Sequence, residues 1–142
     1  MHSETIDYQD GDTQLEAYVT WDDSISEPRA GVLVAHDWTG RRDFATSKAD
    51  EMAALGYVGF ALDMYGKGVF GADGDVEGNS ALMGALAGDR GVLRARMLAA
   101  LDTFKALSVV DNTKIGAMGY CFGGMCVLEV ARAGADVSGV IS

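Results

Sequence analysis

The stretch that decides the fold is KIGAMGYCFGG, Lys114–Gly124. Its first five residues form an apolar run of the length expected for a buried parallel strand. Residues 125–132 have the apolar spacing of a helix, so G-x-C-x-G between them predicts a sharp strand-to-helix turn. Glycines on both sides relieve crowding around the central residue, Cys121. The pattern predicts a nucleophile elbow that presents a thiol to substrate.

The position of this thiol favours nucleophilic chemistry. It would lie at the N-terminus of the following helix, where unpaired N–H groups favour negative charge on the sulfur. The N–H of Phe122, the residue after the cysteine, would be a donor to an oxyanion. The alternative is a glycine-rich turn that packs tightly around a small, buried and unreactive cysteine.

The composition is that of one acidic globular domain, which we place at residues 1–142. Hydrophobic residues make up 49% and charged residues 23%, with 19 glycines and one proline, which suits many tight turns. The net charge of −10 disfavours nucleic acid and anionic membranes as partners. There is no apolar run of about 18 residues and no sign of a secretion signal at residues 1–4.

The chain has two cysteines, Cys121 and Cys126. Five positions apart on one helix, their side chains would point about 140° away from each other. An internal disulfide and a metal site are therefore not expected, and neither is another cofactor. This cysteine usage fits a reducing compartment, and we predict a cytoplasmic location.

The order of predicted elements indicates an α/β fold with three layers, a mostly parallel sheet with helices on both faces. An antiparallel hairpin of residues 4–8 and 13–21 surrounds Asp10-Gly11. The further strands are expected at 30–36, 57–62, 114–118 and 136–141, and the helices at 43–55, 89–107 and 125–132. Between them, residues 64–88 form a long loop with a short helix at 79–86, and residues 111–113 form a turn.

Apolar spacing predicts which helix faces are buried. The expected inner face of the first helix consists of Phe44, Met52, Ala53 and Leu55. The expected inner face of the helix at 89–107 consists of Leu93, Met97, Ala100, Leu101 and Phe104.

Three separated motifs resemble segments of the dienelactone hydrolase family of the α/β-hydrolase superfamily. They are the elbow at residues 119–124, LVAHDWTG at 33–40 and GYVGFALDMYG at 56–66. The motifs stand in the family's order, and the similarity extends over nearly the whole chain. The resemblance implies an α/β-hydrolase fold and hydrolysis of a small carboxylic ester or lactone through a thiol acyl-enzyme.

The same resemblance implies roles for four residues. Cys121 would be the nucleophile, and Asp37 would be the carboxylate that contacts the resting thiol, although dienelactone hydrolase itself has a glutamate there. The backbone N–H groups of Trp38 and Phe122 would form the oxyanion hole.

The substrate-binding candidates come from two other segments. The family uses an arginine ahead of or within the long middle helix to bind a substrate carboxylate. Arg90, Arg94 and Arg96 are the candidates, with Arg90 preferred, and a solvated helix surface is the alternative for each. Tyr65, near the end of the third motif, is the other candidate.

The C-terminal part departs from the family's pattern. Family members continue with two more strands, which supply an aspartate and then a histidine. This sequence has only His2 and His36, and His36 is expected to serve packing or a supporting hydrogen bond. We therefore expect a C-terminally truncated α/β-hydrolase fold with an incomplete Cys-His-Asp triad. Loss of a triad member typically lowers turnover by a factor on the order of 10⁴ to 10⁶.

The lone chain is thus expected to be a weak or inactive hydrolase. The alternative is a non-catalytic remnant that binds ligands or self-associates. A thiol redox protein is disfavoured because C-x-x-C is absent. Residues 137–141 would form a bare apolar sheet edge, and such edges pair with other chains, so we predict a homo-oligomer through this strand.

Overall fold

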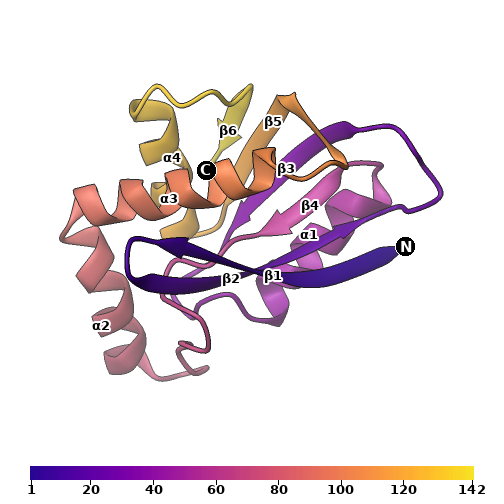
Figure 1. Cartoon of the computed structure of the whole chain (residues 1–142). Coiled ribbons are helices and arrows are strands. Elements are labelled where there is room, and N and C mark those ends of the chain that lie inside the picture. The colour runs from indigo at the N-terminus through magenta and orange to yellow at the C-terminus, as the bar shows by residue number, and fades with distance from the viewer.

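The computed structural model describes residues Met1–Ser142 as a six-stranded sheet with four helices (Figure 1). The strands are β1 (His2–Asp10), β2 (Thr13–Trp21), β3 (Arg29–Ala35), β4 (Val58–Ala61), β5 (Val110–Gly119) and β6 (Gly139–Ile141). The helices are α1 (Asp43–Ala54), α2 (Val76–Ala87), α3 (Arg90–Lys105) and α4 (Phe122–Arg132). The predicted α/β fold is confirmed.

The strand order in the sheet is β1-β2-β4-β3-β5-β6. β1 and β2 pair antiparallel, as the Asp10-Gly11 signal predicted, and β2 pairs antiparallel with β4. The remaining pairs, β4 with β3, β3 with β5 and β5 with β6, are parallel. The carboxyl ends of β3, β4 and β5 therefore meet at one edge of the sheet, which is where open α/β sheets bind ligands.

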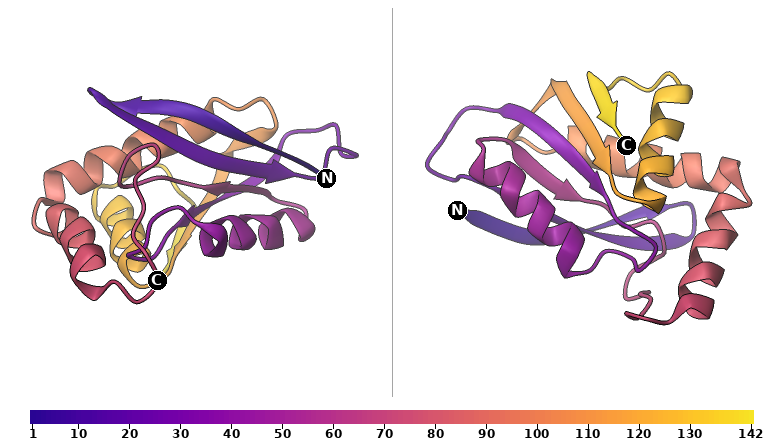
Figure 2. Two further views of the ribbon diagram at one scale, coloured as in Figure 1. Left: turned by 90° about the horizontal axis from the view of Figure 1, so that it is seen from below. Right: turned by 180° about the vertical axis from the view of Figure 1, so that it is seen from behind.

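The helices cover both faces of the sheet. α3 lies in front of it in Figure 1, and α1 lies in front of it in the right-hand view of Figure 2. A Cβ at Gly31 of β3 would overlap the Phe104 ring of α3, whereas a Cβ at Gly59 of β4 would overlap the Ala49 backbone of α1. Glycine at these two positions lets the helices pack directly on the strands.

The predicted inner face of α1 is wrong at two of its positions. Phe44 and Leu55 are 43% and 70% exposed, and Phe44 makes an edge contact with Tyr120 beside the elbow. The buried residues of α1 are all alanines: Ala45, Ala49 and Ala53. At Ala49 the backbone of α1 lies directly against Gly59 of β4, and Ala45 and Ala49 pack with Val34 and Ala61 of the sheet.

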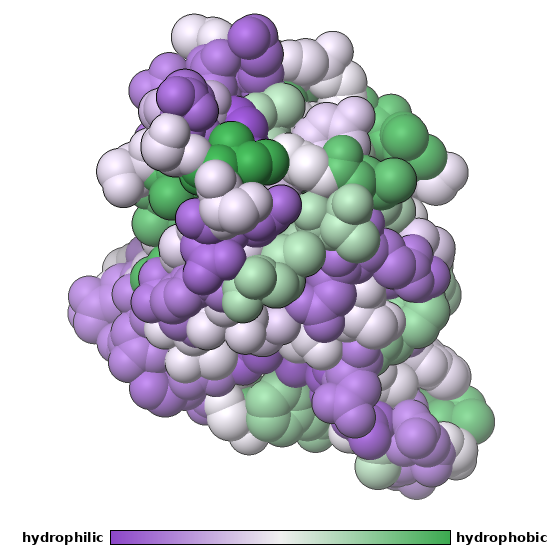
Figure 3. Space-filling model, turned by 90° about the vertical axis from the view of Figure 1, so that its right-hand side faces the viewer, coloured by the Kyte–Doolittle hydropathy of each residue, from purple (hydrophilic) through white to green (hydrophobic).

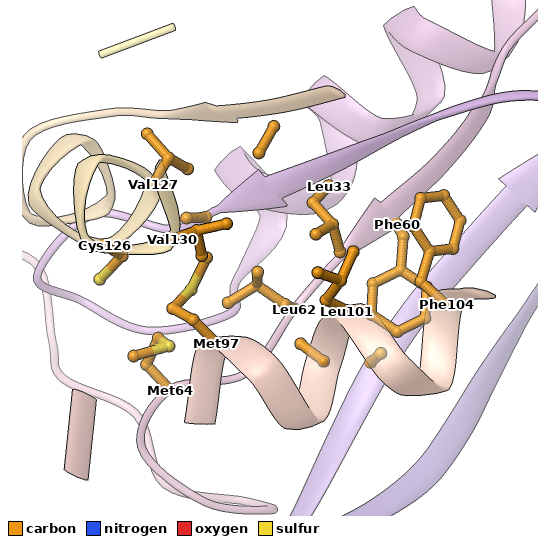
Figure 4. Close-up of a cluster of buried hydrophobic side chains, with 14 of the residues drawn as sticks. Leu33, Phe60, Leu62, Met64, Met97, Leu101, Phe104, Cys126, Val127 and Val130 are labelled. Atoms are coloured by element: carbon orange, nitrogen blue, oxygen red, sulfur yellow. The ribbon is translucent and has the colours of Figure 1, made fainter. Parts of the chain in front are cut away.

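The main core fills the space between the sheet and the pair α3 and α4 (Figure 4). Phe104 of α3 packs against Phe60 of β4, with ring centroids 4.8 Å apart. All five residues of the predicted inner face of α3 are buried. Cys126 and Val130 of α4 reach the same cluster, so the second cysteine is a core residue.

Two connections differ from the prediction. α2 begins at Val76, three residues earlier than expected, because the Asp75 carboxylate caps the helix by accepting from the Gly78 N–H at 3.0 Å. The predicted turn at residues 111–113 lies within β5. There the Asp111 carboxylate accepts from the Thr113 N–H and hydroxyl, and regular pairing with β3 is interrupted.

β6 is a short edge strand. Ile141 is 71% exposed, and a hollow of about 410 Å³ beside β6 is lined mainly by apolar residues of β3, α1, β5 and β6. On the side of the molecule shown in Figure 3, hydrophobic surface forms several patches with hydrophilic residues between them. No helix has both the length and the apolar character needed to cross a membrane.

Candidate active site

Cys121 stands on the turn between β5 and α4. Its backbone has φ 54° and ψ −115°, and it is the one non-glycine residue with positive φ. Its side chain is exposed, whereas Cys126 is buried, and both thiols are free. A side-chain-bearing residue held in such a conformation is strained, and strain of this kind gathers at functional sites. The predicted strand-turn-helix geometry is therefore present.

The elbow is possible because its flanking glycines lack side chains. A Cβ at Gly119 would overlap the Gly123 carbonyl, and a Cβ at Gly123 would overlap the Ala35 carbonyl at the end of β3. The Gly123 N–H donates to the Tyr120 carbonyl at 2.8 Å, which closes the turn. The N–H of Phe122, at the first position of α4, has no partner within the helix and is free for a ligand.

The loop after β3 lies against the elbow and brings a second free donor. The Trp38 N–H has no hydrogen-bond acceptor in the protein. The Tyr65 hydroxyl donates to the Trp38 carbonyl at 2.8 Å, and the Tyr65 ring stacks on Phe122 with centroids 5.8 Å apart. Burial raises the pKa of Tyr65, so its hydroxyl remains a proton donor. Trp38, Tyr65 and Phe122 thus form one packed group.

Asp37 lies in this loop but is not hydrogen-bonded to Cys121. Its Oδ1 accepts from the N–H and the hydroxyl of Thr39, at 2.8 and 2.6 Å. Its side chain also faces a hollow of about 240 Å³ shared with Arg42, Asp43 and Asp73. A role of Asp37 toward the thiol stays a prediction.

Neither histidine can serve Cys121 as a base. His36 is buried, its Nδ1–H donates to the Asp37 carbonyl at 2.6 Å, and its Nε2 accepts from the Met64 N–H at 3.1 Å. Burial lowers the pKa of His36. His2 begins β1, at the opposite end of the parallel strands and four strand spacings from β5, or roughly 19 Å across the sheet.

The arginines of α3 surround a buried carboxylate that the sequence analysis did not single out. Glu129 of α4 is 1% exposed and accepts from Arg94 Nη2 at 2.8 Å and Nε at 3.2 Å. Arg90 Nη1 lies 3.5 Å and Arg132 Nη1 3.8 Å from its other oxygen. The Arg94 hydrogen bond and the surrounding positive charges lower the pKa of Glu129. The sequence does contain a signal for this buried carboxylate, because Glu129 is the one charged residue in the apolar run MCVLEVA at 125–131.

This pairing bears on the predicted substrate contacts. Arg90 is half-exposed and held only loosely by Glu129, so its guanidinium is accessible to a ligand. Arg96 is used structurally, since its Nη1 donates to the Met64 carbonyl at 2.6 Å. Tyr65 and Arg96 line a hollow of about 350 Å³ with apolar residues of α2 and α3. Cys121 lines neither this hollow nor the one at Asp37, and its side chain is exposed.

The strand order, the elbow after β5 and the loop after β3 define an α/β-hydrolase fold. Similarity to known proteins identifies the family within this fold. The profile of the dienelactone hydrolase family matches residues 15–142, and the chain belongs to this family.

Two solved structures and one curated protein are similar to the chain over part of their lengths. A dienelactone hydrolase-like promiscuous phosphotriesterase from metagenomic libraries is 36% identical with a TM-score of 0.94, covering 99% of this chain and 58% of its own. A structure named m3DLH is 37% identical with a TM-score of 0.93, covering 98% and 57%. An uncharacterised protein of Caenorhabditis elegans is 48% identical over 42 residues, which are 30% of this chain and 27% of that protein. The chain thus spans less than three fifths of each of them.

Proposed function

We propose that the protein is a hydrolase of small carboxylic esters or lactones in which Cys121 is the nucleophile. The observation that carries the proposal is the exposed thiol in a strained positive-φ conformation at the N-terminus of α4. Two free backbone donors, from Trp38 and Phe122, lie on the segments that flank it. A nucleophile next to unpaired N–H groups is the arrangement that acyl transfer requires.

In the proposed reaction the Cys121 thiolate attacks the carbonyl carbon of the ester. A C–S bond forms, and the carbonyl oxygen becomes an oxyanion that accepts from the N–H groups of Phe122 and Trp38. Collapse of this intermediate breaks the C–O bond and expels the alkoxide, which takes up a proton from water and leaves as the alcohol. Water then cleaves the thioester and releases the acid. Arg90 and Tyr65 are the proposed substrate contacts.

A histidine that could act as general base for Cys121 is the part that these 142 residues do not supply. His36 has both ring nitrogens engaged, and His2 lies at the wrong end of the sheet. The first step needs only a thiolate, but deacylation by water needs a base, so we propose that the chain acylates and then turns over slowly. The alternative is a non-catalytic binding or self-associating module.

Burst kinetics with p-nitrophenyl acetate test the proposal. The wild-type chain is expected to release about one equivalent of p-nitrophenolate rapidly, followed by slow release. Cys121→Ser is expected to lose the burst, whereas Cys126→Ser is expected to keep it because Cys126 is in the core. A phosphotriester, paraoxon, is the second probe, since one structural relative is named a promiscuous phosphotriesterase.

The results separate the two functions. Continued release that depends on Cys121 supports the enzyme, and a single stoichiometric burst supports the non-catalytic alternative. A burst that survives in Cys121→Ser contradicts the nucleophile assignment altogether.

We also propose that the 142-residue chain self-associates through β6. The strand has an unpaired outer edge, and Ile141 is 71% exposed beside an apolar hollow. Ile141→Lys is expected to shift the light-scattering mass toward the 14.9 kDa monomer. Leu55→Lys is the matched control, because Leu55 is 70% exposed but lies at the end of α1. A wild-type monomer at all concentrations would contradict the proposal.

A further inference from the structure

We infer that His36 is a positioning residue for the oxyanion hole. The inference rests on the proposed function. His36 directly follows β3, is 1% exposed and makes no contact suited to proton transfer at Cys121. Its two hydrogen bonds instead join the loop that carries Trp38 to the loop that follows β4. A buried histidine with both nitrogens used in this way fixes backbone rather than moving protons.

The first hydrogen bond determines where the Trp38 N–H points. The His36 Nδ1–H donates at 2.6 Å to the carbonyl oxygen of Asp37. That oxygen and the Trp38 N–H belong to the same planar trans peptide, in which the C=O and N–H point in opposite directions. Holding the oxygen toward the imidazole therefore directs the N–H away from it. This N–H is the donor that has no acceptor in the protein.

The second hydrogen bond fixes the tautomer. The Met64 N–H lies 3.1 Å from Nε2, and a backbone N–H can only donate, so Nε2 must carry a lone pair. The ring proton is then on Nδ1, where it is needed for the Asp37 carbonyl. Burial lowers the pKa of His36, which keeps the ring neutral near pH 7.

The packing of the ring links this peptide to the other donor. The imidazole meets Tyr65 edge-on, with centroids 4.9 Å apart, and lies 6.0 Å from the ring of Phe122. Phe122 carries the second proposed oxyanion donor. Tyr65 also holds the carbonyl of Trp38, so the peptides before and after the Trp38 Cα are each fixed by one side chain. The spacing between the two N–H groups is set by this aromatic group.

Two amide substitutions separate the two hydrogen bonds. In His36→Asn an N–H can occupy the place of Nδ1, so the bond to the Asp37 carbonyl is kept. In His36→Gln a carbonyl oxygen can take the place of Nε2, so the bond from Met64 is kept and the one to Asp37 is lost. We expect His36→Gln to lower the acylation rate constant with p-nitrophenyl acetate about 10- to 100-fold, less than the loss of a whole oxyanion donor. We expect His36→Asn to recover most of that loss.

Alkylation of Cys121 by iodoacetamide distinguishes a positioning role of His36 from a merely structural one. If the substitutions only disturbed the structure around the elbow, they would slow alkylation as well as acylation. Alkylation forms no oxyanion, so its rate is expected to agree within about twofold among wild type and both variants. A parallel fall in alkylation and acylation, or equal losses in the Asn and Gln variants, would overturn the inference. If wild type shows a burst and His36→Gln leaves its rate unchanged, the positioning role of His36 is contradicted, whereas the proposed function is not. If the wild-type chain shows no burst at all, both the proposed function and the inference about His36 are contradicted.

The tautomer of His36 provides a test of the inference that does not depend on enzymatic activity. Long-range ¹H–¹⁵N spectra of the wild-type chain at pH 7 are expected to show His36 protonated on Nδ1 and unprotonated on Nε2. Protonation on Nε2 would overturn the inference whatever the esterase result.

Discussion

Iodoacetamide at pH 7.5 is expected to alkylate Cys121 at least about a thousandfold faster than Cys126. Burial raises the pKa of Cys126 to about 12, which leaves only about 3 in 10⁵ of its thiol as thiolate. Alkylation also requires the reagent to reach the sulfur, which the core prevents at Cys126 and the elbow allows at Cys121. Cys121 is exposed on the elbow, whereas Cys126 is packed in the main core (Figure 4).

Peptide mass spectrometry over a time course measures both rates in one sample. Cys121→Ser is expected to leave a chain that labels only slowly, and Cys126→Ser is expected to label as fast as wild type. In urea the difference should disappear, because unfolding exposes both thiols. Equal slow labelling of the two cysteines in the native protein would show that the elbow does not present its thiol.

Gly123→Ala is expected to destabilise the protein by about 3 kcal/mol, a large share of the free energy of unfolding of a typical domain. The added Cβ would overlap the carbonyls of Ala35 and His36, which are backbone atoms and cannot move without displacing β3. α4 would have to shift away from the sheet, and the elbow would open. Urea unfolding followed by circular dichroism measures the change.

Gly84→Ala is the matched control within the same chain. Gly84 lies in α2, and a Cβ there meets no atom within 4 Å. Because alanine has less backbone freedom in the unfolded chain, this substitution is expected to stabilise by about 0.5–1 kcal/mol. A Gly123→Ala variant as stable as Gly84→Ala would mean that the elbow does not pack on β3 as the structure has it.

Local patterns predicted the elements whose signal is contained in a few neighbouring residues. Asp10-Gly11 between two alternating runs predicted the hairpin, and the apolar spacing of α3 predicted its buried face. In α1 the apolar spacing correctly placed Ala53 inside but wrongly placed Phe44 and Leu55 there, because such spacing favours large side chains. Its inner face consists of alanines, chosen by the closeness of the sheet at Gly59, a residue that follows α1 in the chain.

For the candidate site too, some features were predictable from local sequence and others depended on tertiary packing. G-x-C-x-G between a strand and a helix was enough to locate the turn and its exposed thiol, because backbone conformation at a tight turn depends on which residues lack a Cβ. The partners of the charged and polar groups were decided only by packing. Glu129 meets arginines 35 and 39 positions away, and His36 meets a backbone N–H 28 positions away. Such contacts depend on how the layers close on one another, which no local pattern encodes.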